Sequence, residues 1–556
     1  GEVWVKTGVY TNSSFYMLPF CVTVVGGFAG NETSAGQANP EAYPSVLTGD
    51  LAGNNYWKSD DKVSRGSIWS GMTFNAPNPQ GTNVFWGATG DISDGSFGFY
   101  DTSSTLSDFK LVGLTFTGYR YSAAFLGGTG TVLSNCTILA SNCRNNVDQS
   151  QAAVWLTGTS GAIVGCTFIG NYRPLSASVP LVKDCRFTEN WCSARDGGGL
   201  DIRGAMTVTN CVFYRNSTTH MNAAAAVNMN NTTGYGNFYD CTFEENRIGS
   251  GGQATVWAKN GVVTRCKFLR NRVLAAAGAH NTACFKMAGG DFLVRDSYFV
   301  GNSIAGASSG TGEYMWSVIG YSTDGRLAFF NSTFTGSKVT ATAKAGSLDI
   351  GSFGAASTSD NQTLALANCT VVGSEFDCTE DGGVCRVGEC AYTTAATAIS
   401  TFGVVNCIFW GAANDYVAIY QHANLVPLIA NSYLKNYSAE GLTLGSNDYI
   451  ENLYTSGNLG LLSKPRDPGD GIYLPQIGVT GASAFKKAGV PVYVSGTKCY
   501  FYDANKKTYR NIGGKGSTKS SVGDIQPDAW GAARVADKIS LGPINYLPQS
   551  FSIIVR

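Results

Sequence analysis

Three cationic side chains in the middle of the chain are of types that abstract protons, namely Arg203, Lys259 and Lys286. A lysine or arginine can act as the base beside the carboxylate of a uronic acid, provided that a second cation or Ca²⁺ neutralises that carboxylate. This chemistry would be that of a polysaccharide lyase. The three residues lie at unequal distances before the nearest copies of the repeat described below, so the sequence does not place them side by side.

Aromatic and polar side chains alternate with these cations along the sequence and could bind a sugar chain. An indole ring packs against a pyranose face, and amide and carboxylate groups hydrogen-bond to hydroxyls. The residues of this predicted groove are Trp155, Asp201, Asn228, Asn230 and Trp257. The alternative is an ordinary solvated strand face, which carries the same residue types.

Hydrolytic chemistries find less support than a lyase. An inverting glycosidase needs two carboxyl groups about 6.5–9.5 Å apart, but Asp201 has Asn228 rather than an acid in the next repeat. Asp196 is roughly 15 Å from Asp201 if the chain between them is extended. The chain holds 3 His, and none neighbours a nucleophile motif such as GxSxG. The sequence therefore favours neither a glycosidase nor a serine-hydrolase triad.

One acidic segment resembles the start of a calcium-binding loop. Asp377 and Asp381 are spaced like the first ligands of an EF-hand, but Glu389 falls one residue late for the closing ligand. Ca²⁺ is the one metal that this pattern suggests, and no other cofactor is predicted. The same segment holds three cysteines without a CxxC pair or a nearby His, which favours a disulfide over zinc. These cysteines are Cys378, Cys385 and Cys390.

Composition limits the class of partner. The chain has 39 Lys and Arg against 39 Asp and Glu, and only 14% of its residues are charged. A neutral chain has little electrostatic means to bind nucleic acid or an anionic membrane. No stretch approaches the roughly 20 apolar residues of a membrane span. The 16 Cys suggest an oxidising compartment, so we expect a secreted or cell-surface protein.

An internal repeat organises the middle of the chain. Each copy has a small residue, then a polar residue, then an aromatic or aliphatic one, and most copies have Asn three residues later. The small residue is usually cysteine, as at Cys166, Cys185, Cys211, Cys241, Cys266, Cys369 and Cys407. Ser takes this place at Ser297 and Ser332. The unequal spacing of the copies argues against helical hairpins and fits short strands joined by corners of variable length.

The alternation within each copy predicts how the strands are stacked. The small and aromatic residues share one face of a strand, a second strand precedes each copy, and helix signals are nearly absent. Successive coils wound in one direction would pair equivalent strands in parallel about 4.8 Å apart. The repeat cysteines would then form a column of buried free thiols. The Asn residues would lie at a shared corner, where they can form a hydrogen-bonded ladder and suit left-handed backbone.

We therefore predict an all-β chain folded as a right-handed parallel β-helix, a solenoid of stacked coils. Residues 1–105 are expected to form an N-terminal cap and the first coils, and residues 106–445 the central coils. Residues 446–556 are expected to form a C-terminal coil and cap region with a β-hairpin that begins near Cys499.

Both ends of the chain resemble a known family. Segments 2–10, 24–33 and 44–50, and the closing segments 471–475 and 528–543, are similar to the opening and closing blocks of bacterial secreted right-handed parallel β-helix repeat proteins of the surface-anchored type. The copies with Phe and Asn also resemble the FxxN repeats of polymorphic outer-membrane proteins, which are autotransported adhesins. The resemblance implies this fold and an extracellular location, and it implies little about activity.

These observations favour a non-catalytic, extracellular or cell-surface protein that engages glycans or surfaces as an adhesin does, or that serves as a structural or filament subunit. The expected partner is a polysaccharide or cell-surface glycan, and self-association into fibres is a further expectation. The alternative is a polysaccharide lyase acting on an acidic glycan, with a glycosidase as a weaker option.

Overall fold

The computed structural model is almost entirely β-structure. Its one described helical element is a single 3₁₀ turn, η1 (Ala35–Gln37), and no described helix is long and apolar enough to cross a membrane. The structure describes residues 1–12, 14–16, 21–49, 55–56, 83–84, 98–101, 109–119, 121–141, 152–192, 196–218, 223–229, 234–249, 254–276, 282–287, 289–306, 314–322, 325–341, 345–348, 352–353, 363–373, 375–378, 385–390, 400–410, 417–420, 425–434, 449–454, 489–503, 507–512, 518–519 and 521.

The chain divides into two compact units, each of which is described by itself. Unit 1 comprises Gly1–Gly261 and Cys266–Lys286, and unit 2 comprises Val262–Arg265 and Met287–Arg556. One unit boundary falls in strand β30 (Gly261–Thr264). The predicted domain boundaries after residues 105 and 445 lie outside the described residues, so they stay predictions.

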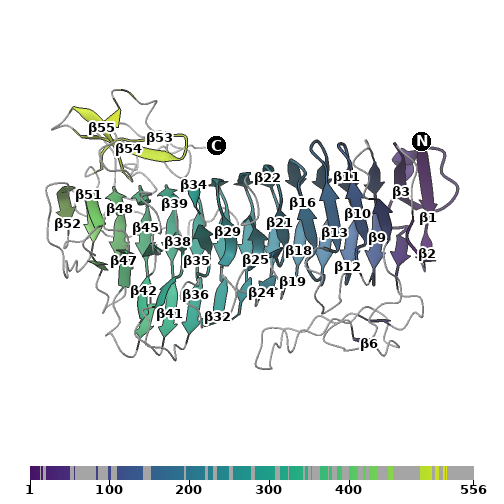
Figure 1. Cartoon of the computed structure of the whole chain (residues 1–556), viewed down its shortest axis with the longest axis horizontal. Helices are drawn as coiled ribbons and strands as arrows, with labels where there is room; N and C mark the ends of the chain where they lie inside the picture. The colour runs from purple at the N-terminus through teal and green to yellow at the C-terminus, as the bar shows by residue number, and fades with distance from the viewer. Residues whose placement is uncertain are drawn as a thin grey trace, which may run out of the picture. The chain divides into compact units, whose positions relative to one another are not determined.

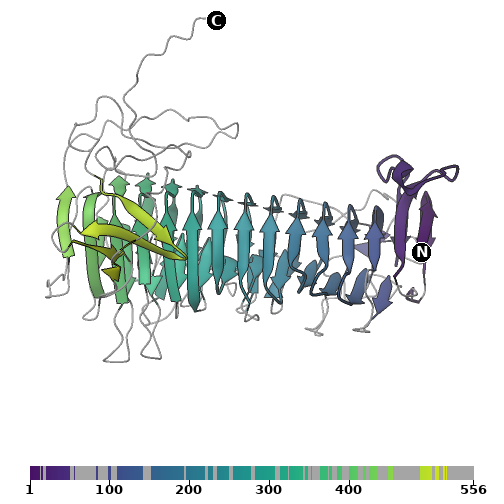
Figure 2. The same cartoon turned by 90° about the horizontal axis from the view of Figure 1, so that it is seen from above.

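The first sheet of unit 1 takes two short strands from each coil, and its described pairings are parallel (Figures 1 and 2). Equivalent residues face one another, so that Phe168 pairs with Phe187 and Phe187 with Phe213. The strands are β1 (Glu2–Lys6), β2 (Gly8–Thr11), β3 (Thr23–Phe28), β4 (Ser45–Thr48), β8 (Lys110–Val112), β9 (Leu114–Thr117), β11 (Val132–Ser134), β12 (Thr137–Leu139), β14 (Ala162–Val164), β15 (Thr167–Ile169), β17 (Leu181–Lys183), β18 (Arg186–Thr188), β22 (Met206–Thr209), β23 (Val212–Tyr214), β26 (Gly236–Tyr239), β27 (Thr242–Glu244) and β31 (Lys267–Leu269).

Two further parallel sheets complete the coils of unit 1. The second sheet contains β7 (Phe99–Asp101), β10 (Ala124–Gly127), β13 (Val154–Thr157), β16 (Leu175–Ala177), β20 (Asp196–Gly197), β21 (Leu200–Ile202), β25 (Ala223–Asn228), β29 (Ala254–Ala258) and β33 (Phe285–Met287). The third sheet contains β19 (Trp191–Cys192), β24 (Ser217–Thr218), β28 (Arg247–Ile248) and β32 (Arg272–Ala276). A separate two-stranded sheet joins β5 (Asn55–Tyr56) and β6 (Asn83–Val84).

Unit 2 repeats the same three-sheet plan. Its first sheet contains β34 (Gly290–Arg295), β35 (Tyr298–Val300), β39 (Gly325–Phe330), β40 (Thr333–Thr335), β44 (Thr363–Ala367), β45 (Thr370–Val372), β48 (Ser400–Val405), β49 (Ile408–Trp410), β51 (Leu425–Leu434) and β52 (Tyr449–Tyr454). The second sheet contains β37 (Tyr314–Ser317), β38 (Gly320–Ser322), β42 (Ala345–Leu348), β43 (Ser352–Phe353), β47 (Cys385–Cys390) and β50 (Val417–Tyr420). The third sheet contains β36 (Ser303–Gly306), β41 (Lys338–Ala341) and β46 (Glu375–Cys378). The parallel β-helix predicted from the repeat is confirmed.

The core of unit 1 contains the two columns that the repeat predicts. Adjacent rings of the phenylalanine column stack nearly parallel, with centroids 4.6–5.0 Å apart, at Phe168, Phe187, Phe213, Phe243 and Phe268. The cysteine column beside it has buried thiols, none of them in a disulfide, at Cys166, Cys185, Cys211, Cys241 and Cys266. In unit 2 the thiols of Cys369 and Cys407 are likewise buried and free.

A ladder of buried asparagines follows the phenylalanine column. Asn216 shows the pattern: its Nδ2 donates to the carbonyl oxygen of Phe187 at 2.9 Å and to Asn246 Oδ1 at 3.2 Å. Its Oδ1 accepts from the backbone N–H and the Nδ2 of Asn190 at 3.1 and 3.0 Å. The equivalent rungs at Asn171, Asn190, Asn246 and Asn271 are also fully buried. The ladder satisfies the polar groups of a corner that no water reaches.

The left-handed backbone lies beside these asparagines rather than at them, which corrects the sequence prediction. In each corner the residue before the asparagine has a positive φ, as at Glu189 (53°), Arg215 (54°) and Glu245 (53°). A second left-handed residue precedes each repeat cysteine, as at Asp184 (55°) and Asn210 (51°). Asx side chains tolerate this conformation, but Glu and Arg hold it here because the flanking strands fix both ends of the corner.

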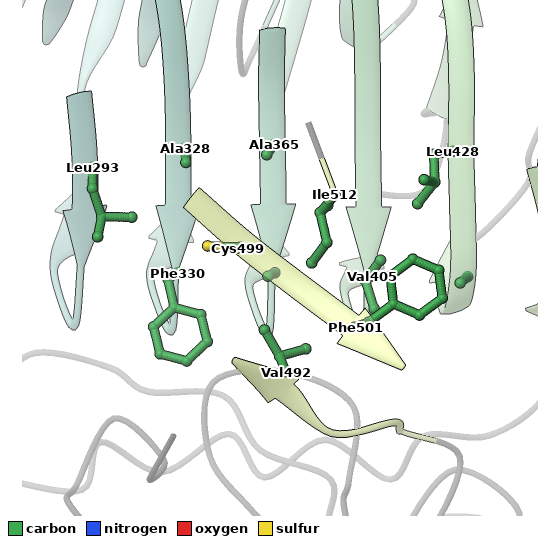
Figure 3. Close-up of a cluster of buried hydrophobic side chains, with 12 residues drawn as sticks. Leu293, Ala328, Phe330, Ala365, Val405, Leu428, Val492, Cys499, Phe501 and Ile512 are labelled. Atoms are coloured by element: carbon green, nitrogen blue, oxygen red, sulfur yellow. The ribbon is translucent and has the colours of Figure 1, made fainter. Parts of the chain in front are cut away.

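A small antiparallel sheet covers the outer face of the first sheet in unit 2. It consists of β53 (Val492–Ser495), β54 (Lys498–Asp503), β55 (Thr508–Asn511) and β56 (Thr518–Lys519). The predicted hairpin near Cys499 is therefore present, as β54 and β55. Figure 3 shows β54 crossing the parallel strands, with Cys499 and Phe501 buried in a cluster with Phe330 and Val405.

Alanine and glycine on the parallel strands make room for this covering sheet. Leu293, Ala328, Ala365 and Gly403 lie opposite one another on successive parallel strands. At Gly403 a Cβ atom would come within 1.7 Å of the carbonyl oxygen of Ile512, so only glycine permits this approach. The outer face of these strands is thus built to be covered.

Candidate functional site

The outer face of the second sheet in unit 1 collects most of the predicted groove. Its strands place Trp155 opposite Ser176, Ser176 opposite Asp201, Asp201 opposite Asn228, and Asn228 opposite Trp257. The residues on either side of Asp201 point into the core, so the alternation of a strand turns Asp201 and its column outward. We call this set the outer column. The fifth predicted groove residue, Asn230, lies outside the described residues.

Asp201 is the centre of a polar network in the outer column. Its side chain is 2% exposed, although it points away from the core. Its Oδ2 accepts from Ser176 Oγ at 3.2 Å and pairs with Arg203, and its Oδ1 accepts from Asn228 Nδ2 at 3.2 Å. Burial raises the pKa of the Asp201 carboxyl, and the charge of Arg203 opposes that rise. The network is therefore a desolvated carboxylate held by a guanidinium and two neutral groups.

A buried second cation, Arg173, acts on the same carboxylate. Arg173 is 2% exposed and has a left-handed φ of 48°. Its positive charge favours the ionised form of Asp201. No sequence pattern singles out Arg173, because its position before Pro174 resembles an ordinary turn. Together Arg173 and Arg203 give the site around Asp201 more positive than negative charge.

Aromatic rings continue the outer column toward the N-terminus. Tyr100 stacks on Phe125 with centroids 5.3 Å apart, and Phe125 stacks on Trp155 at 5.6 Å. The guanidinium of Arg203, two coils further on, lies 5.4 Å from the Trp155 ring centroid. Trp155 is therefore covered by Phe125 from one side and by Arg203 from the other. In this arrangement it offers ring edges, and no open face, to a sugar.

Lys286 and Trp257 form a comparable pair further along. Lys286 is 8% exposed, and its Nζ lies 4.9 Å from the Trp257 ring centroid. Burial lowers the pKa of Lys286 to about 8. An amine with this pKa is partly neutral just above neutral pH, which is the state that a general base requires.

The three predicted cations do not come together. Arg203 directly follows β21, and Lys286 lies on β33. Strands β25 and β29 separate those two strands, so about 14 Å lies between them at the ordinary strand spacing. Lys259 lies in the bend after β29, half-buried, with no hydrogen bond or ion pair to any described residue. No two of the three meet over one carboxylate.

The calcium and disulfide predictions fall on side chains outside the described part of the structure, so they stay predictions. Within the described residues no three metal-ligating side chains are grouped as a metal site requires. Asp377 lies on β46, but its side chain and the whole of Asp381 are outside the described part. The same holds for the thiols of Cys378, Cys385 and Cys390, and the described cysteines are all free.

Comparisons with known proteins give a structural likeness only, at low sequence identity. No family model and no curated protein matches the chain. A solved structure described as a new PL6 alginate lyase complex with trisaccharide is 12% identical to this chain, with a TM-score of 0.30. The match covers 82% of this chain and 87% of that chain.

Proposed function

We propose that this chain is an extracellular β-helix protein that binds an acidic polysaccharide through the outer column of unit 1 and does not cleave it. The observation that carries the proposal is the excess of cations at this face. Arg203 and Lys286 lie along it, and the charge of the buried Arg173 acts on the same site, against one described carboxylate, that of Asp201. Such a face favours a chain of carboxylate or sulfate groups over a neutral glycan.

Arg203 is the residue best placed to meet the ligand. Its side chain is 29% exposed, whereas Asp201 beneath it is 2% exposed. A guanidinium has five N–H donors in a planar fork that matches a carboxylate or sulfate. Contact with Asp201 and Trp155 fixes the Arg203 side chain before the ligand arrives, which lowers the entropy cost of binding. Recognition then depends on charge and hydrogen bonds rather than on sugar stacking against Trp155.

We expect no cleavage because the predicted cations are separated. A lyase needs its base and the group that neutralises the uronate to act on one sugar. Arg203 and Lys286 are on strands about 14 Å apart, so they do not meet over one sugar. One observation favours the lyase nevertheless, which is the lowered pKa of Lys286. A product assay therefore accompanies the binding assay.

Binding is tested with an array of uronate-containing, sulfated and neutral oligosaccharides. Acidic members should bind, and the double variant Asp201→Asn/Arg203→Gln should weaken that binding about tenfold, since charge-assisted contacts contribute roughly 1.5–3 kcal/mol. The double variant leaves no unpaired buried carboxylate, and circular dichroism checks that the loss of the negative charge near Arg173 leaves the chain folded. Arg186→Gln, on the exposed face of the first sheet, is the matched control and should bind normally.

The outcomes separate the two functions. Equal binding by the double variant and the unaltered chain would place recognition elsewhere. Release of unsaturated sugar, seen as ultraviolet absorbance and lost in Lys286→Ala, would replace the binding proposal with a lyase. No absorbance change, with retained affinity, supports a non-catalytic binder.

Self-association is a second candidate, favoured by exposed apolar side chains on β1 and β2. Among the described residues β1 pairs with β3 only, and β2 with β4 only. Val3 and Tyr10 begin columns that are buried in later coils, yet they are 46% and 36% exposed. Exposed apolar side chains on such strands can promote pairing with a strand of another chain.

End-to-end stacking is tested by light scattering and electron microscopy across a concentration series. If the edge of β2 mediates it, Val9→Lys should hold the chain in its smallest species, because charge on an edge strand opposes pairing. Lys110→Gln, on an internal strand, is the control. Assembly that is equal in Val9→Lys and the unaltered chain would exclude this edge as the contact.

A further inference from the structure

The third sheet of unit 1 places two arginines side by side. Ser217 pairs with Arg247, and Arg247 with Arg272, on strands β24, β28 and β32. The next residues along, Ile248 and Val273, are buried in the core. By strand alternation Arg247 and Arg272 therefore point outward from neighbouring strands, about 4.8 Å apart at the backbone. Arg247 is half-buried and Arg272 is exposed.

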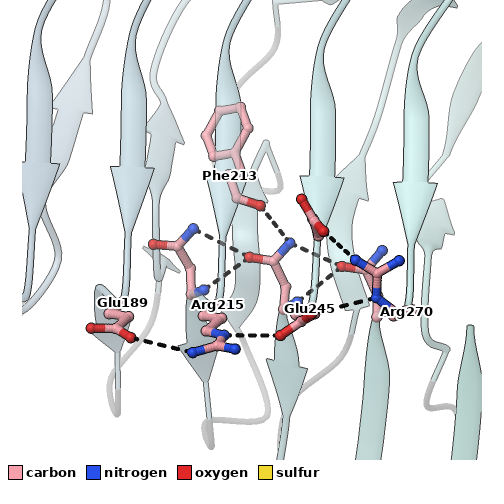
Figure 4. A network of polar contacts seen from close by, with 9 residues as sticks. Glu189, Phe213, Arg215, Glu245 and Arg270 are labelled. Carbon is pink, nitrogen blue, oxygen red and sulfur yellow. Dashed lines mark hydrogen bonds and ion pairs between the residues drawn. The ribbon is translucent and has the colours of Figure 1, made fainter. Parts of the chain in front are cut away.

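A ladder of ion pairs occupies the adjacent corner (Figure 4). Arg215 contacts Glu189 at 3.9 Å and Glu245 at 2.9 Å, and Arg270 contacts Glu245 at 3.4 Å. Arg270 also pairs with Glu244. Acidic and basic side chains thus alternate along successive coils, and Arg215 and Arg270 already hold the carboxylates of this corner.

The two arginines of the third sheet stand outside that ladder. The backbone N–H groups of Arg247 and Arg272 donate to Asn216 and Asn246, but neither guanidinium has a hydrogen bond or an ion pair to any residue that the structure describes. Like charges directly opposite one another on paired strands are destabilising. Burial lowers the pKa of Arg247, and the positive charge of Arg215 lowers it further. The negative charges of Glu245 and Glu189 act in the opposite direction on Arg247, but neither carboxylate forms an ion pair with Arg247 or Arg272. The fold therefore maintains two adjacent guanidinium groups without a paired carboxylate among the described residues.

We propose that Arg247 and Arg272 form a binding site for an oxyanion with several oxygens, such as a sulfate group. Two guanidinium forks can each present parallel N–H donors to one such group. The anion would also remove the repulsion between the two cations, so binding and relief of strain act together. A monatomic anion satisfies fewer donors and would bind less well. This site lies on a different sheet from the outer column and does not depend on the function proposed there.

The test is calorimetric titration of the full chain with sodium sulfate, with sodium chloride at equal ionic strength as the reference. Sulfate should bind to the unaltered chain. Arg272→Gln or Arg247→Gln should weaken sulfate binding about tenfold, and the combined Arg247→Gln/Arg272→Gln variant should abolish it. Arg186→Gln should bind as the unaltered chain does. The Asp201→Asn/Arg203→Gln variant should also keep this binding, which separates the site from the outer column.

A second arm distinguishes a free ion from a glycan-borne group. A sulfated oligosaccharide that binds through Arg247 and Arg272, while its desulfated form does not, would identify the source as a sulfated glycan. Sulfate binding without oligosaccharide binding would identify a site for a free oxyanion.

Stability measured without sulfate guards against a folding defect. Arg272→Gln removes a like charge, so at low salt its midpoint of unfolding should equal or exceed that of the unaltered chain. The proposal is overturned if sulfate binds no better than chloride. It is equally overturned if the Arg247→Gln/Arg272→Gln variant, shown to be folded by circular dichroism, binds sulfate as well as the unaltered chain does.

Discussion

Replacing Asn216 with alanine is expected to lower the free energy of unfolding by about 4 kcal/mol, because it breaks a buried ladder in its middle. The change removes the Nδ2 that serves the carbonyl oxygen of Phe187 and the Oδ1 that serves two N–H groups of Asn190. These groups are fully buried and would have no water to replace the lost partner. Each unsatisfied buried group costs roughly 1–3 kcal/mol.

The measurement is denaturant unfolding combined with amide hydrogen exchange. Solenoids can unfold in parts, so exchange at the neighbouring Asn190 amide reports the local effect directly. Asn237→Ala is the matched control, since Asn237 is half-exposed on the outer face of β26 and its loss should stay within about 0.5 kcal/mol. A loss in Asn216→Ala no larger than in this control would mean that the ladder does not hold the corner.

The repeat predicted these internal columns because its pattern is local. Cysteine and phenylalanine two residues apart must share a strand face, whatever the corners do. The asparagine ladder followed from the same stacking. The position of the left-handed residue could not be predicted in this way. Glu189 and Arg215 are residue types that rarely adopt a left-handed backbone, and they do so here because the flanking strands fix both ends of the corner.

The lateral relations of the outer face were harder to predict. Consecutive asparagine rungs are 19, 26, 30 and 25 residues apart in the sequence, so corners of different length intervene between equivalent strands. Offsets from the repeat therefore could not show that Arg203 reaches back to Trp155, or that Arg247 faces Arg272. Arg173 was missed for a related reason, since only the register of β16 with β21 brings its corner near Asp201.

The stability of the chain should rise between pH 8 and about 10.5 by an amount that depends on Lys286. Burial lowers its folded-state pKa to about 8, whereas a lysine in an unfolded chain titrates near about 10.4. Between these values the unfolded state binds more protons, so the free energy of unfolding increases with pH. Below pH 8 both states are protonated, and the full penalty for burying the charge, about 3 kcal/mol, is present.

Lys286→Met should remove this dependence. The variant is expected to be more stable than the unaltered chain at pH 7, by up to about 3 kcal/mol less the cation–π contact with Trp257. The difference between the two should shrink as pH rises toward 10.5. Unfolding midpoints of both proteins across pH 6–10.5 measure it, and the difference cancels groups that titrate in common.

Lys183→Met controls for the loss of one positive charge, because Lys183 is exposed on β17 and lies 3.8 Å from Asp184. A difference between Lys286→Met and the unaltered chain that stays constant with pH would show that Lys286 titrates alike in both states. The lowered pKa of Lys286 would then be wrong, and the one observation that favours a lyase would be lost with it. A difference that shrinks as described leaves Lys286 as an amine poised for proton transfer, and only the product assay decides whether it is used.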